Sequence, residues 1–99
     1  MNINIQSIGF VADVKLENFI ESKLEKIMKL NDDVLGAEVF LKVEKAASAE
    51  NKIVEVSLNV KGGDFFAKKQ SKTFEESTDS AIEALRKQVV KHKEKLRAK

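Results

Sequence analysis

Residues 73–99 constrain the fold more than any other stretch, because they hold neither proline nor glycine and their apolar residues recur at helical spacing. Thr73 and Glu76 have the spacing of a capping box, in which each side chain satisfies a backbone N–H group left unpaired at a helix start. We therefore predict one long helix that begins near Phe74 and packs on an apolar layer. Its apolar stripe consists of Phe74, Thr78, Ala81, Ile82, Leu85, Val89, His92 and Leu96.

Charge is distributed unevenly along this helix. The acids gather in its first turns, an order that suits the helix dipole. They are Glu75, Glu76, Asp79 and Glu83. Residues 86–99 then carry seven basic residues and one acid, a net charge of +6, although the whole chain has a net charge of only +2. A molecule polarised in this way is expected to bind a polyanion.

Three earlier runs alternate between apolar and polar residues, which is typical of strands with one face against a core. They are residues 2–8, 36–45 and 52–61. The pair Gly62-Gly63 supplies a tight hairpin turn, so we predict a fourth strand that begins at Asp64. Between the first two runs, Asp13 is a candidate N-cap for an amphipathic helix that ends near Leu30.

The predicted order is β-α-β-β-β-α, an α+β fold in one domain that spans residues 1–99. The first two strands flank a helix and should be parallel neighbours with a right-handed crossover, while the last three form an antiparallel meander. Both helices need the same sheet face for their apolar stripes. We therefore predict a two-layer sandwich, with two helices on one face of a four-stranded mixed sheet and with Phe40 and Phe66 among charges on the other. Because one core uses both stripes, the free domain should be a monomer.

The residue types that catalysis needs are scarce. The chain has one His and no Cys, which excludes thiolate catalysis, thiolate metal sites and disulfides. His92 is the only candidate general base, but it lies on the apolar stripe, where a packed or capping imidazole is the simpler interpretation. The acid pairs Asp32-Asp33 and Glu75-Glu76 fit helix termini better than a calcium loop. We expect no enzyme, no cofactor, no metal and no small-molecule substrate.

The sequence carries no targeting pattern that we can identify. Residues 1–12 lack the basic start and unbroken apolar stretch of a signal peptide. No later run approaches the ~20 apolar residues that a membrane-spanning helix needs. Together with the lack of Cys, this predicts a cytoplasmic protein with no membrane partner.

Two rows of basic side chains border the apolar stripe of the C-terminal helix. One flank carries Lys87, Lys91 and Lys95 at i, i+4 spacing, and the other carries Arg86, Lys93 and Arg97. Like charges at this spacing repel one another, and only Glu94 relieves them. A solvated helix end whose lysines match the dipole fits the pattern as well as polyanion binding does.

Residues outside the C-terminal helix are further candidates for contact with RNA. If both helices lie on one sheet face, Lys23 and Lys26 can join the basic rows in a surface that follows a folded RNA backbone. Phe40 and Phe66 could stack bases, although cross-strand packing accounts for such rings more simply. An RNA-recognition motif is excluded, because that fold needs a helix where the double glycine stands. An alternative from another class is a protein-interaction module, whose basic helix docks on an acidic protein.

Several segments resemble the ribosome hibernation promoting factors and ribosome-associated translation inhibitors, and the resemblance covers the whole chain. They are LKVEK at 41–45, VKGGD at 60–64 and QVVKHKEKL at 88–96. The more specific part is Lys-His-Lys-x-Lys at 91–95 together with Lys23-x-x-Lys26. The resemblance implies binding to ribosomal RNA in the decoding channel of the small ribosomal subunit, where messenger and transfer RNA would lie. It thereby implies translation inhibition in idle, stationary-phase cells. The predicted RNA-binding residues are Lys23, Lys26, Arg86, Lys87, Lys91, His92, Lys93, Lys95 and Arg97.

The chain departs from that family in two respects. The family's second helix usually begins Asp-Met-Tyr-Ala-Ala-Ile-Asp, whereas residues 73–79 read TFEESTD. Thr73 thus replaces the acidic cap, and Glu75 stands where Tyr is usual, so a contact made by that Tyr is not expected here. The chain also stops at Lys99, without the C-terminal domain by which long forms pair ribosomes, and so resembles the short form.

Overall fold

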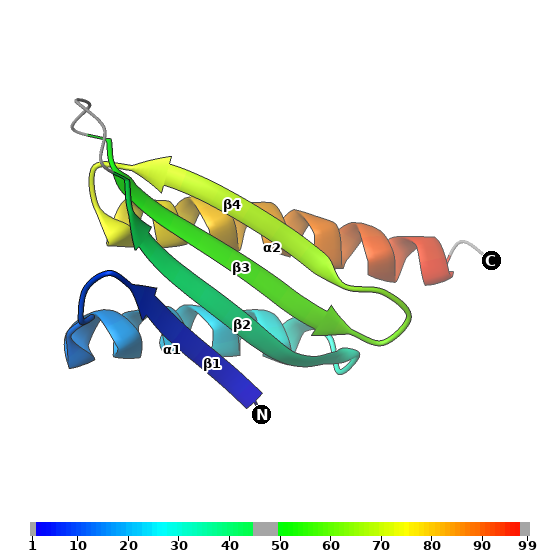
Figure 1. The fold of residues 1–99 in the computed structure, drawn as a ribbon. Coiled ribbons are helices and arrows are strands. Elements are labelled where there is room, and N and C mark those ends of the chain that lie inside the picture. Colours follow the sequence, from blue (N-terminus) through cyan, green and yellow to red (C-terminus); the bar gives the residue numbers. More distant parts are fainter. Residues whose placement is uncertain (1, 45–49, 98–99) are drawn as a thin grey trace.

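The structure is a computed structural model that describes residues 2–44 and 50–97, with side chains described through residue 92. Its elements follow the predicted order β-α-β-β-β-α, which is confirmed (Figure 1). They are β1 (Asn2–Ile8), α1 (Val14–Leu30), β2 (Val34–Val43), β3 (Lys52–Val60), β4 (Phe65–Ser71) and α2 (Phe74–Arg97).

The four strands form one mixed sheet in the order β1-β2-β3-β4, also as predicted. β1 runs parallel to β2, and β3 and β4 continue as an antiparallel meander. Both helices lie on the same face of the sheet and run in the same direction (Figure 1). We call the uncovered side the open face. Because the strand order is β1-β2-β3-β4, β1 and β4 are the two edge strands.

The starts of two strands differ from the predictions, and β2 and β3 end at Val43 and Val60, two residues and one residue before the predicted ends. β2 begins at Val34 rather than Gly36, because Val34 pairs with Val60 beyond a register irregularity. β4 begins at Phe65 rather than Asp64, because the Asp64 carboxylate accepts a hydrogen bond from the Val60 N–H group at 3.4 Å within the turn. Gly62 has φ +92° in this turn, a conformation that favours glycine.

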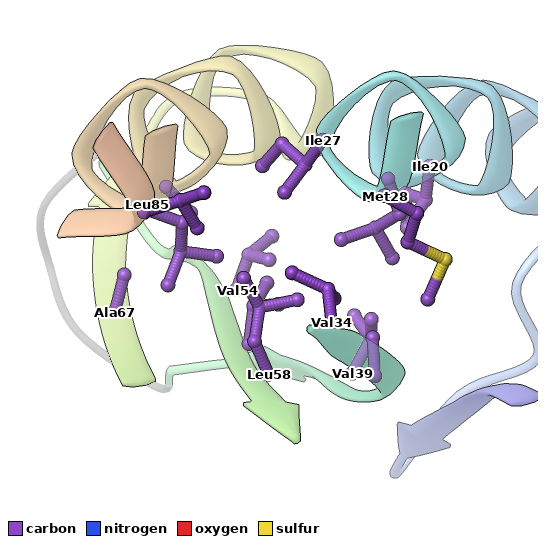
Figure 2. Packing of buried hydrophobic residues seen from close by; sticks show 14 of the residues in the cluster. Ile20, Ile27, Met28, Val34, Val39, Val54, Leu58, Ala67 and Leu85 are labelled. Atoms are coloured by element: carbon purple, nitrogen blue, oxygen red, sulfur yellow. The ribbon is translucent and has the colours of Figure 1, made fainter. Parts of the chain in front are cut away.

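The core lies between the helices and the sheet. In Figure 2, Ile27 of α1 and Leu85 of α2 lie over Val54 and Leu58 of β3. All four side chains are almost completely buried. The predicted inward residues of β3 and the central part of the α2 stripe are thus confirmed as core, and they fix α2 rotationally so that its charged side faces solvent.

The predicted N-cap residue of each helix accepts a backbone hydrogen bond, so the N-caps Asp13 and Thr73 are confirmed. The Asp13 Oδ1 atom accepts a hydrogen bond from the Leu16 N–H group at 2.8 Å, and the Thr73 Oγ1 atom accepts one from the Glu76 N–H group at 3.0 Å. A further polar contact, between α2 and β3, was not predicted. Ser77, which is completely buried, donates from its hydroxyl to the carbonyl oxygen of Lys52 at 2.7 Å and so ties α2 to β3.

Candidate nucleic-acid interface

The solvent side of α2 presents basic side chains. Arg86, Lys87 and Lys91 are exposed, and Val90, which is 44% exposed, lies among them. The Arg86 guanidinium pairs with Glu83 at 3.2 Å, but both groups are well exposed, so the pair stabilises the helix by less than about 1 kcal/mol. Within the described residues, Lys87 and Lys91 have no ion-pair partner. Their ammonium groups are thus available to an anionic ligand.

The two flanks of α2 face different neighbours. On one flank, the Asp79 carboxylate lies 3.4 Å from the Lys23 Nζ atom, so this flank faces α1. Arg86 follows Asp79 at i+7 and belongs to the same flank. On the other flank, the Gln88 Nε2 atom donates to the Phe66 carbonyl oxygen at 3.2 Å, so this flank faces β4. The row that contains Lys87 and Lys91 therefore lies beside an edge strand.

The structure brings Lys23 next to α2, but to its acidic start rather than to its basic half. Because the helices run in the same direction, Lys23 meets Asp79. Its Nζ atom also lies 5.3 Å from the centre of the Phe19 ring. Much of its charge is thus engaged within the protein. Lys26 lies almost one turn further along α1 and is exposed. Because the two helices run in the same direction, this places it further than Lys23 towards the basic half of α2.

His92 lies on the inner side of α2, as its place in the stripe predicted. Its ring is half-buried and meets the Phe65 ring edge-on, with 5.5 Å between the ring centres and 76° between the planes. The Nε2 atom is buried and has no hydrogen-bond partner in the described part of the structure. This geometry agrees with the packed imidazole that the sequence favoured over a general base.

The last basic residues fall at the limit of what the structure describes. The backbone at residues 93–97 is helical. The side chains of Lys93, Lys95 and Arg97 lie outside the described residues, and so does that of Leu96. Their predicted contacts with RNA remain predictions.

Sequence reasoning missed the basic residues of β4. Lys69 pairs with the buried Val54 and therefore shares the sheet face that carries the helices, while its neighbour Lys68 lies on the open face. Lys69 and Lys87 line one surface hollow, with Asp79, Ser80, Glu83 and Ala84. The pattern that reveals such a residue is a lysine at an inward position of an edge strand, which discourages strand pairing with other chains.

Other site types receive no support from the geometry. Among the described residues, no group of three or more His, Asp and Glu side chains is placed to hold a metal ion. Nor does that part of the chain contain a helix that is both long and apolar enough to cross a membrane. The candidate site is the basic surface of α2 and β4, which the exposed side chains of Arg86, Lys87, Lys91 and Lys69 define.

Comparison with known proteins gives relatives over nearly the full chain. The family model described as Sigma 54 modulation protein / S30EA ribosomal protein matches residues 3–97. A ribosome hibernation promoting factor from Klebsiella oxytoca is 28% identical over 97 residues, which cover 98% of each chain. The one from Escherichia coli strain K12 is 29% identical with the same coverage.

Solved structures share the fold. A ribosomal subunit interface protein from Coxiella burnetii superposes with a TM-score of 0.83 at 22% identity, over 94% of this chain and 98% of that one. The N-terminal domain of Thermus thermophilus Protein Y gives 0.77 at 21% identity, over 90% and 96%. The resemblance drawn from the sequence motifs is thereby confirmed, and the chain belongs to the Sigma 54 modulation protein / S30EA ribosomal protein family.

Proposed function

We propose that this protein is a ribosome hibernation factor of the cytoplasm. It binds ribosomal RNA in the decoding channel of the small ribosomal subunit, blocks the binding of messenger and transfer RNA, and inhibits translation in idle cells. The names of its relatives support a role at the ribosome. The observation that carries the proposal to this chain is the row of exposed basic side chains on α2, in which Lys87 and Lys91 lack acidic partners among the described residues.

The proposed inhibition depends on charge neutralisation between basic side chains and RNA phosphates, and it needs no chemical reaction. An RNA backbone carries one negative charge per nucleotide, and each ammonium that lies on a phosphate releases condensed counterions, which favours binding. Occupying the channel is sufficient to exclude the other RNAs, so no catalytic group is required. We propose that the protein is not an enzyme and that the free domain is a monomer, since both helices use their apolar stripes in one core.

The other candidate is a protein-interaction module that places the same helix on an acidic protein. The two proposals differ in what the helix contacts, RNA phosphates or carboxylates. Co-sedimentation with ribosomes from stationary-phase cells separates them. Hibernation through ribosomal RNA predicts that the protein sediments with ribosomes and is released by RNase or high salt. Sedimentation that survives RNase treatment would favour a protein partner instead.

A further inference from the structure

The open face of the sheet exposes one aromatic ring. Of the aromatic side chains that the structure describes, Phe66 alone is mostly exposed, with 55% of its surface in contact with solvent. It stands near the start of β4, on the side away from the helices, because its neighbour Ala67 points into the core. An apolar ring of this size left in water is a candidate contact surface.

Cross-strand packing, the simpler interpretation of this ring from the sequence, does not cover it. The residue directly opposite Phe66 on β3 is Ser57, whose side chain is too small to shield an aromatic ring. On its other side Phe66 has no strand, because β4 is the edge of the sheet. Phe40 lies two strands away on β2, opposite Glu55, and therefore does not pair with it.

β4 places a basic side chain beside the ring, which suits a phosphate. Lys68 follows at i+2 on the same face and is exposed. The acid opposite Lys68 is Glu55, whose side chain is only 15% exposed and whose carboxylate already pairs with the Lys42 Nζ atom at 2.8 Å. β4 itself holds two lysines, Lys68 and Lys69, and no acid. The strand that carries the ring is therefore basic, while the exposed acids Asp64, two residues before the ring, and Glu38, in the same cross-strand row as Phe66 and Ser57, lie outside β4.

The backbone of Phe66 contacts the β4 flank of α2, although its ring lies on the other face of the sheet. The Phe66 carbonyl oxygen accepts the hydrogen bond from Gln88, the residue that follows Lys87 on α2. A nucleotide chain with its phosphates along Lys87 and Lys91 thus meets the edge of β4. From that edge an unpaired base has direct access to the open face.

We infer that Phe66 is a base-stacking residue, on whose ring an unpaired nucleotide of single-stranded RNA lies while Lys68 contacts a neighbouring phosphate. Aromatic rings flanked by basic side chains are the usual platform for single strands, and the contact tolerates any base because every base has a π-face. The inference rests on the proposed function, since it takes RNA as the ligand. It adds a contact on the opposite side of the sheet from the helices.

A tryptophan reporter tests the stacking directly. The chain contains neither Trp nor Tyr, so Phe66→Trp introduces a single fluorophore at the proposed site. Titration with a single-stranded oligoadenylate should quench its emission saturably, because a stacked base quenches indole fluorescence. The matched control is Val11→Trp, since Val11 is 94% exposed in the connection between β1 and α1. Unchanged emission from Phe66→Trp, or equal quenching of both variants, would overturn the inference.

A second comparison separates this inference from the proposed function. Phe66→Leu keeps an apolar side chain but removes the ring, and it should weaken oligoadenylate and ribosome binding about tenfold, whereas Phe66→Tyr should bind as the unchanged protein does. Circular dichroism should show the same fold for both variants, because the side chain is exposed. If charge reversal at Lys87 and Lys91 abolishes ribosome binding while Phe66→Leu leaves it intact, stacking is wrong and the proposed function stands. If neither change affects ribosome binding, stacking is wrong and so is the placement of the Lys87 and Lys91 row on ribosomal RNA. If the unchanged protein itself does not sediment with ribosomes, the proposed function is wrong.

Discussion

The Gln88 side-chain amide donates a hydrogen bond to the Phe66 carbonyl oxygen across 3.2 Å, joining the basic half of α2 to the edge strand β4. The contact has two consequences. It satisfies a backbone acceptor that an edge strand leaves without a strand partner. It also places the row of Lys87 and Lys91 beside β4, which carries Lys69 on the helix face and the ring of Phe66 on the open face, so that the candidate interface spans a helix and a strand.

Removing this amide should loosen the edge slightly. We expect Gln88→Ala to lower the free energy of unfolding by about 1 kcal/mol, the net contribution of one hydrogen bond. Urea denaturation followed by circular dichroism measures the change. Gln6→Ala, at an exposed position of the opposite edge strand, is the matched control and should leave the midpoint in place. Equal midpoints for the two variants would contradict a stabilising role for the contact.

Charge reversal should abolish binding without unfolding the protein. Lys87→Glu combined with Lys91→Glu changes two exposed side chains and leaves the buried residues of α2 untouched. We expect ribosome co-sedimentation and inhibition of cell-free translation to be lost. Lys15→Glu combined with Lys61→Glu makes the same change in net charge at exposed positions outside α2 and should retain both activities. A folded Lys87/Lys91 variant that still inhibits would remove this row from the mechanism.

Ribosome binding should weaken steeply with salt. If about six basic side chains contact phosphates, the logarithm of affinity should fall with the logarithm of salt concentration at a slope near −4, taking roughly 0.7 per contact for single-stranded RNA. Binding of labelled protein to small ribosomal subunits at several potassium chloride concentrations gives the slope. A flat response would rule out an electrostatic interface.

The inner and outer sides of α2 should respond differently to truncation. Leu85 is completely buried, and Leu85→Ala should lower the free energy of unfolding by about 3 kcal/mol because it removes buried methyl groups and leaves a cavity. Val90 lies on the solvent side of the same helix, and Val90→Ala should change stability by no more than about 0.5 kcal/mol. Thermal and urea unfolding test the difference. Similar losses from the two variants would mean that α2 is oriented differently.

The buried hydroxyl of Ser77 should matter more than its small size suggests. Its bond to the Lys52 carbonyl oxygen joins α2 to β3, and the Ser71 hydroxyl oxygen lies 2.6 Å from it. Ser77→Ala should lower the free energy of unfolding by about 1 kcal/mol or somewhat more, since a part-buried carbonyl group loses a donor. Ser80→Ala, at an exposed position on the same helix, should have little effect. Unfolding of both variants in urea makes the comparison, and equal stabilities would contradict the bond.

The sequence by itself determined the features that depend on residues close together in the chain. Alternation places Val54 and Leu58 on one side of a strand, helical spacing places Leu85 on one side of a helix, and capping residues mark both helix starts. These patterns also predicted the topology, because a helix between two strands and a double-glycine turn leave few ways to connect a sheet. The exposed row of Lys87 and Lys91 followed from the same spacing.

Only the tertiary structure decided which distant residues meet. The offset of α2 along the sheet sets Gln88 on the Phe66 carbonyl, brings Lys69 to the flank of Lys87, and matches Lys23 with Asp79 rather than with the basic half of α2. Local periodicity fixes the direction in which a side chain points. It does not fix how far one element slides along another, because that offset is set by the packing of all the core side chains together.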